Sequence, residues 1–220
     1  MGGYCVLNFK AYPNSFGARA LELAKAAAEV ADSSSVSIVV CPQAVDLRAI
    51  ASQCKVPVFA QGVDANKPGA FTGSLTPEAV KDAGATGTLI NHSERKLPLE
   101  AVNAIIDRCA EAGIFSLCCA ATIDECAAIA AMRPDFIAIE PPELIGKGIS
   151  VSTAKPEIVS GAVRAVKDVA DIPVFCGAGV SNGVDVAKAL ELGAEGVLLA
   201  SAFVNAKDPA ALLREMADSL

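Results

Sequence analysis

The sequence predicts an α/β protein: one single-domain (β/α)8 barrel over residues 1–220, compact and with shortened helices. Short apolar segments alternate with longer helical segments along the whole chain, and this alternation repeats eight times without a break. Eight unbroken strand–helix units favour a closed parallel barrel, with a doubly wound sheet as the alternative. Such barrels typically have about 250 residues, so a chain of 220 residues must have trimmed helices.

The predicted strands are short, apolar on both faces, and bounded by glycine, proline or polar residues. These features are typical of parallel strands that are buried on both sides. The predicted strands are Cys5–Asn8, Ser37–Cys41, Val56–Ala60, Gly87–Ile90, Phe115–Cys119, Phe136–Ile139, Val174–Cys176 and Gly196–Leu199.

The predicted helices are rich in Ala, Leu, Glu and Lys. Pro77, Pro156 and Pro209 stand where a first helical turn begins, and Gly84 and Gly113 follow helix ends. The predicted helices are Gly17–Val30, Val45–Gln53, Pro77–Ala83, Pro98–Ala112, Ile123–Met132, Pro156–Ala170, Gly183–Leu192 and Pro209–Ser219.

The composition excludes several classes of protein. A net charge of −7 argues against nucleic acid as a partner, although one local cationic site is enough for a small anionic substrate. No uncharged apolar run reaches eighteen residues, so no membrane span is expected. The eight cysteines form no C-x-x-C pair and no signal peptide is evident, which indicates a cytoplasmic protein with reduced thiols in its core.

Polar residues directly after the strands are the candidate catalytic groups, because active sites of such barrels lie at the carboxyl ends of the strands. Asn8 and Lys10 follow the first strand, His92 the fourth and Glu140 the sixth. Taken singly, each has a plain alternative: a solvated strand end, a structural histidine, or an ordinary loop carboxylate. If a short helix begins beside His92, its dipole disfavours a charged imidazolium.

The loops after the last two strands predict a phosphate site. Gly177–Gly179 and Ala200–Ala202 consist of small residues that let backbone N–H groups approach a ligand. After Glu140, the stiff pair Pro141–Pro142 precedes Glu143–Gly148, whose glycines suit a lid.

A base, a neutral hydrogen-bond donor and a cation beside a phosphate suit proton transfer next to a carbonyl through an enediolate.

Five segments in order resemble the triosephosphate isomerase family, and specifically its shorter archaeal-type branch. They are Asn8–Lys10, Gly69–Gly73, Asn91–Arg95, Ala138–Pro141 and Gly177–Val180. The resemblance covers essentially the whole chain. It implies a TIM barrel that interconverts D-glyceraldehyde 3-phosphate and dihydroxyacetone phosphate in glycolysis and gluconeogenesis, with no cofactor and no metal.

The resemblance also implies residue roles. Glu140 would be the catalytic base, His92 the neutral electrophile and Lys10 the electrostatic clamp, with Asn8 orienting Lys10 or the substrate. Supporting roles would fall to Ser93 and Glu94 behind the site, and the substrate phosphate would be held by Ile145, Gly146, Gly179, Ala200 and Ser201.

The segment Gly69–Gly73 resembles the loop that enters a neighbouring subunit, with Phe71 and Thr72 at the interface and Thr72 near that subunit's active site. The resemblance therefore implies a homo-oligomer, a tetramer in preference to a dimer. Trimmed helices would expose apolar surface that association covers.

Several positions depart from the broader family pattern. Pro142–Glu143 replaces a Val-Trp pair, Ala200–Ser201 replaces Gly-Gly, and Gly179 stands where Ser is usual. Lys147 at the lid tip and Gly62 before the intersubunit loop are less expected. These two positions bear on lid motion and interface strength.

Two other functions fit parts of the sequence. Another phosphate-binding barrel, such as an epimerase, would normally need a metal, which a single histidine disfavours. A catalytically silent scaffold would be expected to lack at least one of Lys10, His92 and Glu140, and all three are present.

Overall fold

The computed structural model describes residues 3–142 and 150–220, and within them eight parallel strands form a nearly closed barrel. The strands run in the order β2-β1-β8-β7-β6-β5-β4-β3. Their bounds are β1 Tyr4–Asn8, β2 Ser37–Cys41, β3 Phe59–Ala60, β4 Gly87–Ile90, β5 Phe115–Ala120, β6 Phe136–Ile139, β7 Val174–Gly177 and β8 Gly196–Leu199. The predicted (β/α)8 fold is confirmed.

The ring closes between β2 and β3 through a single parallel bridge, Val40 to Val58. The amide of Val40 donates to the carbonyl of Pro57 at 3.0 Å. Proline has no N–H to donate, so the ladder stays short here. This explains why β3 is only Phe59–Ala60 although the sequence predicted a strand from Val56.

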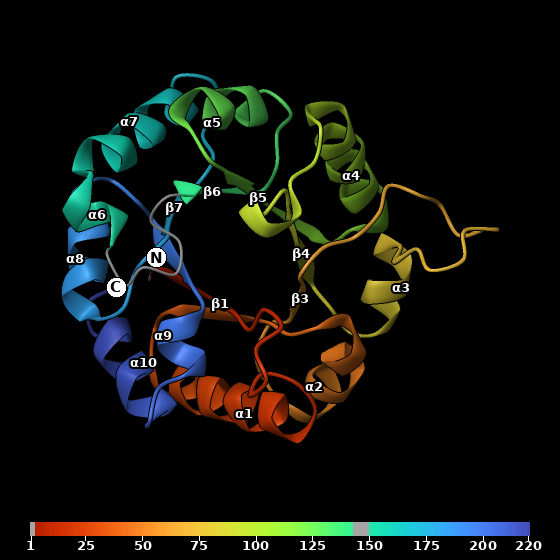
Figure 1. Ribbon diagram of the computed structural model, residues 1–220, viewed down its shortest axis with the longest axis horizontal. Coiled ribbons are helices and arrows are strands. Elements are labelled where there is room, and N and C mark those ends of the chain that lie inside the picture. Colours follow the sequence, from red (N-terminus) through yellow and green to blue (C-terminus); the bar gives the residue numbers. More distant parts are fainter. Residues whose placement is uncertain (1–2, 143–149) are drawn as a thin grey trace.

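Helices surround the barrel (Figure 1). The longer ones match the predicted segments to within a few residues at each end. The helices of the described part are α1 Ala18–Ser33, η1 Ala44–Asp46, α2 Leu47–Gln53, α3 Pro77–Asp82, η2 Ser93–Arg95, α4 Leu99–Ala112, α5 Ile123–Ala130, α6 Val151–Ala154, α7 Pro156–Lys167, α8 Gly183–Glu191, α9 Ser201–Val204 and α10 Pro209–Ala217.

Side chains at the helix starts explain where several helices begin. Thr76, Thr122, Asn182 and Asp208 each accept a hydrogen bond from a backbone amide three residues on, at α3, α5, α8 and α10. Each such cap is worth about 1 kcal/mol. At the other end of α4, Gly113 adopts φ 69°, the left-handed conformation that glycine permits at low cost.

Two apolar layers hold the barrel together. Outward-facing strand residues pack against the helices in the larger cluster. Inward-facing residues fill the barrel itself, and they are Val6, Val39, Cys41, Phe59, Leu89, Leu117, Cys119, Ala138, Phe175 and Leu198. Three rings close the end at which the strands begin: Tyr4, Phe136 and Phe175 lie with their centroids 5.2 Å apart in every pair. The opposite end is left open for a site.

All eight cysteines are buried and none is in a disulfide, as predicted. Burial raises the pKa of the Cys5, Cys109, Cys126 and Cys176 thiols to about 12. They therefore stay protonated and pack as small apolar side chains. No helix in the described ranges has the length and apolar character needed to cross a membrane.

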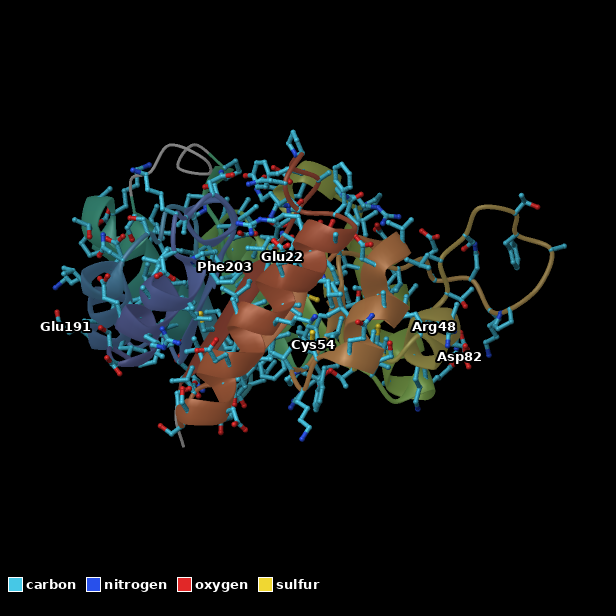
Figure 2. The ribbon with its side chains drawn as sticks, turned by 90° about the horizontal axis from the view of Figure 1, so that it is seen from below. Glu22, Arg48, Cys54, Asp82, Glu191 and Phe203 are labelled. Carbon is cyan, nitrogen blue, oxygen red and sulfur yellow. The ribbon has the colours of Figure 1, made fainter. Side chains whose placement is uncertain are left out.

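The segment between β3 and α3 stands out from the barrel. Figures 1 and 2 both show it projecting away from the body of the molecule, beyond α3. It contains Phe71 and Thr72, and Phe71 is 52% exposed. Two ion pairs connect the base of this segment to the body. In the first, Asp64 of the segment pairs with Arg95 at 3.0 Å, and in the second, Lys67 of the segment pairs with Glu111 at 3.5 Å.

Candidate active site

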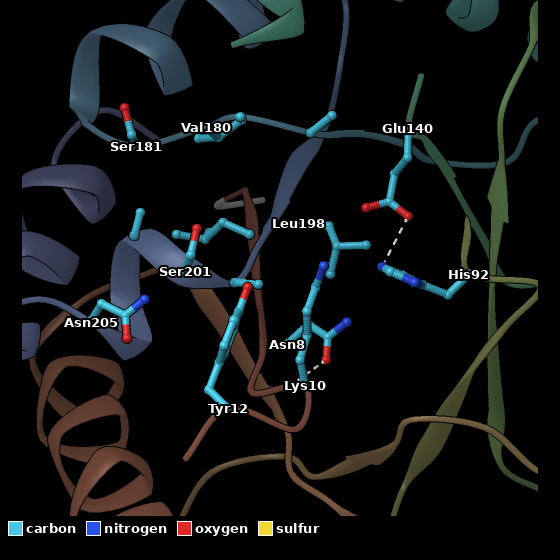
Figure 3. Close-up of a pocket in the computed structure, with 15 residues that line it drawn as sticks. Asn8, Lys10, Tyr12, His92, Glu140, Val180, Ser181, Leu198, Ser201 and Asn205 are labelled. Atoms are coloured by element: carbon cyan, nitrogen blue, oxygen red, sulfur yellow. Dashed lines mark hydrogen bonds and ion pairs between the residues drawn. The ribbon is translucent and has the colours of Figure 1, made fainter. Parts of the chain in front are cut away.

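A cavity of about 290 Å³ opens at the carboxyl ends of the strands (Figure 3). Residues from β1, β4, β6, β7 and β8, or from the loops that follow them, line it. They are Asn8, Lys10, Tyr12, His92, Glu140, Ala178, Gly179, Val180, Ser181, Leu198, Leu199, Ala200, Ser201, Ala202 and Asn205. The structure thus brings together every predicted catalytic residue at the end of the barrel where such sites lie.

Glu140 enters the cavity from the end of β6. Its amide donates to the carbonyl of Ala120 at 2.8 Å, which fixes the start of the side chain beside β5. The residue is only 5% exposed, and its Oε2 atom has no hydrogen-bond partner in the described part of the chain. A buried carboxylate oxygen without a hydrogen-bond partner destabilises the fold, so its presence indicates a chemical task.

Small and neutral neighbours make room for this carboxyl. A Cβ atom at Gly177 would lie 2.4 Å from Glu140 Cγ, so only glycine leaves space for the side chain. Burial first, and then the adjacent Glu140 carboxylate, raise the pKa of the Cys119 thiol well above its ordinary value. Cys119 therefore places an uncharged thiol next to the Glu140 carboxylate.

His92 faces Glu140 across the cavity, with its Nε2 atom 3.6 Å from Glu140 Oε2 (Figure 3). On the other side of the ring, the amide of Glu94 donates to Nδ1 at 3.2 Å, which makes His92 the capping residue of η2. A nitrogen that accepts a hydrogen bond carries no proton. The arrangement thus corresponds to a neutral imidazole whose Nε2–H points into the site, and the short helix expected beside His92 is present.

Lys10 is held in an uncommon conformation, with φ 50°. Such a left-handed non-glycine residue costs about 1–3 kcal/mol and must be held by its neighbours. Asn8 Oδ1 accepts from the Lys10 amide at 3.0 Å, and Gln61 Nε2 donates to the Lys10 carbonyl at 2.9 Å. The ammonium pairs with Glu94 Oε1 at 2.8 Å, and the Lys10 side chain is 11% exposed against 58% for Glu94. A cation therefore reaches the cavity already oriented.

The wall opposite Glu140 and His92 consists of small residues (Figure 3). Ala178 and Gly179 have φ values of 72° and 75°, a sharp turn after β7. Asp185 holds Ser181, two residues after Gly179, because Asp185 Oδ2 accepts from the Ser181 amide at 2.9 Å and from the Ser181 hydroxyl at 3.0 Å. This wall can receive an anion against accessible backbone.

The remaining predicted site residues divide into three groups. Gly179, Ala200 and Ser201 line the cavity, with Ser201 at the start of α9. Ser93 lies in η2, next to His92, and is not among the residues that line this cavity. Ile145 and Gly146 lie outside the described residues, as do Glu143, Lys147 and the rest of the expected lid.

Sequence reasoning missed three residues that belong to the site. Tyr12 and Asn205 line the cavity although neither directly follows a strand. Gln61 does follow β3, so the rule that identified His92 and Glu140 could also have found it. Gln61 Nε2 bridges the Lys10 carbonyl and the Cys41 carbonyl at 2.9 and 3.0 Å.

Gly62, unexpected from the sequence, has a local structural reason. A Cβ atom there would lie 2.7 Å from the Arg95 guanidinium, which pairs with Asp64 at 3.0 Å. Glycine therefore lets Arg95 connect the loop after β4 to the base of the projecting segment. In the described residues, no group of three or more His, Cys, Asp and Glu side chains lies close enough to hold a metal ion.

The fold and this site define a class: barrel isomerases that move a proton between carbons beside a carbonyl. The family model described as triosephosphate isomerase matches residues 4–216. The triosephosphate isomerase of Methanocaldococcus jannaschii is 50% identical over 96% of this chain and 97% of its own. That of Methanothermus fervidus is 48% identical over 96% of this chain and 96% of its own. That of Methanothermobacter thermautotrophicus is 49% identical over 93% of this chain and 90% of its own.

The chain belongs to the triosephosphate isomerase family, whose members are intramolecular aldose–ketose isomerases. The resemblance seen in the sequence segments is confirmed, including its archaeal character.

Proposed function

We propose that this chain interconverts D-glyceraldehyde 3-phosphate and dihydroxyacetone phosphate in glycolysis, and also in gluconeogenesis, as one catalytic domain over residues 1–220. The observation that carries the proposal is the Glu140–His92 pair: a buried carboxylate oxygen without a hydrogen-bond partner, 3.6 Å from an imidazole nitrogen that is free to donate. The match to the triosephosphate isomerase family supports the class of substrate, a triose phosphate.

In the proposed mechanism Glu140 is the base. It takes a proton from the carbon next to the carbonyl and returns it to the neighbouring carbon, while the hydroxyl proton passes to the former carbonyl oxygen, so no proton is gained or lost overall. His92 donates through Nε2 to the oxygen that becomes negative, and Lys10 stabilises the same charge electrostatically. Asn8 keeps Lys10 in place through its hydrogen bond to the Lys10 amide.

The phosphate would lie against the wall formed after β7 and β8, where Gly179, Ala200 and Ser201 leave the backbone accessible. Ile145 and Gly146 are proposed to complete this site, and Glu94 and Ser93 to support it from behind. Backbone N–H groups suit a phosphate because they offer hydrogen bonds without a side chain that must be ordered.

The reaction needs no metal in this proposal. Turnover of glyceraldehyde 3-phosphate in buffer treated with a chelator is expected to equal turnover in untreated buffer, measured with a coupled assay. An enzyme of the alternative kind, a metal-dependent epimerase, would lose activity in the chelator and regain it with a divalent cation, and that result would overturn the assignment.

We also propose that the chain forms a homotetramer in the cytoplasm. A second cavity of about 300 Å³ adjoins the first and shares Asn8, Lys10 and His92 with it. Its location beside the catalytic groups suits the tip of a projecting segment, such as Phe71–Thr72, from another subunit. The exposed side chains of Phe16 (50%) and Val45 (83%) offer apolar surface for the contact.

Light scattering is expected to give a mass four times the 22.3 kDa of one chain. Phe71→Asp should lower that mass, because a charge would have to be desolvated in the interface. The variant is also expected to lose activity in parallel with association. A wild-type mass of one chain would contradict the proposal, and a mass of two chains would replace the tetramer with the dimer.

A further inference from the structure

Glu125 connects the loop that carries His92 to the end of β5. It lies in the first turn of α5, where Thr122 caps the helix by accepting from the Glu125 amide at 3.1 Å. A Thr-x-x-Glu sequence at a helix start usually forms a capping box, in which the glutamate reaches back to the backbone of its own helix. Here one carboxylate oxygen reaches one residue further back, to the residue before the cap: Oε2 accepts from the Ala121 amide at 2.7 Å.

The other oxygen has a different task. Glu125 Oε1 accepts from Asn91 Nδ2 at 2.8 Å and from the Lys96 ammonium at 2.5 Å. Asn91 and Lys96 lie at the two ends of the segment that contains His92. Burial raises the pKa of the Glu125 carboxyl, but hydrogen bonds from Lys96, Ala121 and Asn91 outweigh burial and lower it. The carboxylate is therefore the ionised centre of this cluster.

Asn91 depends on such contacts. It is 2% exposed and has φ 60°, the left-handed conformation that asparagine adopts more readily than most residues, and its buried amide needs hydrogen-bond partners. Its Oδ1 accepts from the Leu97 amide at 3.0 Å, which closes the segment 91–97 into a ring. Its Nδ2 also donates to the carbonyl of Cys119 at 2.9 Å, at the end of β5.

The same end of β5 anchors the catalytic base. The residue after Cys119 is Ala120, whose carbonyl accepts from the Glu140 amide at 2.8 Å. Two consecutive carbonyls of β5 thus position the His92 loop on one side and Glu140 on the other. Glu125 tightens the first of these attachments through Asn91 and Lys96.

We propose that Glu125 is a positioning residue for isomerisation, which sets the His92–Glu140 separation by holding the His92 loop against the end of β5 through Asn91 and Lys96. The inference rests on the proposed roles of His92 and Glu140. Small displacements matter because a shift of about 1 Å in a catalytic group can cost about 10²-fold in rate.

Glu125→Gln tests the proposal. Whichever way the new amide turns, its NH₂ group faces either the Ala121 amide or the donors of Asn91 and Lys96, so one attachment is lost. We expect kcat to fall about 10-fold, a fraction of the cost of a 1 Å displacement. The inhibition constant of inorganic phosphate should remain that of wild type, because the phosphate wall lies on the opposite side of the cavity.

A direct readout does not depend on turnover. His92 is the only histidine of the chain, so the imidazole ¹⁵N signals in an NMR spectrum belong to His92 alone. Those signals should move in Glu125→Gln and in Lys96→Met, which removes the other side of the ion pair.

Two matched controls separate positioning from helix capping. Asp124→Asn removes the same charge from the same turn of α5, at an exposed side chain outside this cluster. Thr122→Ala removes the cap at α5 but leaves the Oε1 contacts intact. Both controls should keep wild-type kcat and wild-type His92 signals, and Thr122→Ala should lower Tm.

If Glu125→Gln lowers only Tm, and the His92 signals stay in place, Glu125 is a helix cap and the proposal is wrong. Should that variant fail to fold, Lys96→Met decides alone: unchanged kcat and unchanged imidazole signals would overturn the proposal. A shifted imidazole signal with unchanged kcat would contradict the proposed effect of Glu125 on catalysis. If the proposed catalytic roles of His92 and Glu140 are wrong, the activities of His92→Gln and Glu140→Gln will show this independently of Glu125.

Discussion

Replacing Glu140 with glutamine is expected to lower kcat/KM by about 10²–10⁴-fold or more, the usual contribution of a general base. The amide is almost the same size as the carboxyl, so it fits the space that Gly177 leaves. It cannot accept a proton at neutral pH, and proton transfer between carbons would have no carrier. The coupled isomerase assay measures the loss directly.

The stability of the same variant separates chemistry from folding. Glu140 is 5% exposed and its Oε2 lacks a hydrogen-bond partner, so the buried charge is a cost to the folded state. Glu140→Gln should therefore keep or raise Tm while activity falls. Glu140→Asp, which retains a carboxylate but withdraws it by one methylene, should be intermediate in rate. If Glu140→Gln turned over like wild type, Glu140 would not be the base.

The sequence predicted the barrel because the signals that determine it are local. Buried apolar strands, proline at helix starts and glycine at helix ends each depend on a few neighbouring residues, as at Pro77 and Gly113. The strands Ser37–Cys41, Gly87–Ile90, Phe136–Ile139 and Gly196–Leu199 agree with prediction at both ends. Burial on both faces leaves few alternatives for such segments.

The short helices could not be predicted in the same way. α6 and α9 have four residues each, about one helical turn, which is too short to show a hydrophobic period. The contacts that hold α6 come from distant parts of the chain, since the Val151 amide donates to the Ala178 carbonyl at 3.2 Å. Tyr12 and Asn205 were missed for a related reason, because tertiary packing and not a strand end brings them to the cavity.

The sequence predicted those residues of the candidate site that lie at the ends of strands. Asn8 ends β1, His92 lies two residues after β4 and Glu140 directly follows β6, so the topology alone brings them to one end of the barrel. The supporting contacts follow no such rule. Glu125 looks like an ordinary capping-box glutamate, and only the fold shows that its second oxygen faces Asn91, 34 residues away in sequence.

Replacing His92 with glutamine is expected to lower kcat/KM by about 10²-fold or more, as for the loss of a donor to a developing oxyanion. Glutamine can still donate, but its side chain has one more rotatable bond than histidine and lacks the ring that the Glu94 amide fixes by donating to Nδ1 at 3.2 Å. The donor would then no longer be fixed where the negative oxygen forms. The same assay, with kcat and KM determined separately, measures the effect.

Phosphate inhibition and Tm of the His92→Gln variant distinguish an electrophile from a structural histidine. An electrophile acts on the reacting oxygen alone, so inorganic phosphate should inhibit His92→Gln as strongly as wild type while kcat falls. A structural histidine would weaken phosphate binding and lower Tm together, because Asn8, Lys10 and the phosphate wall line the same cavity. Unchanged kcat/KM in a folded variant would remove His92 from the mechanism, and Lys10 would then be the remaining described cation near the cavity that could stabilise the oxyanion.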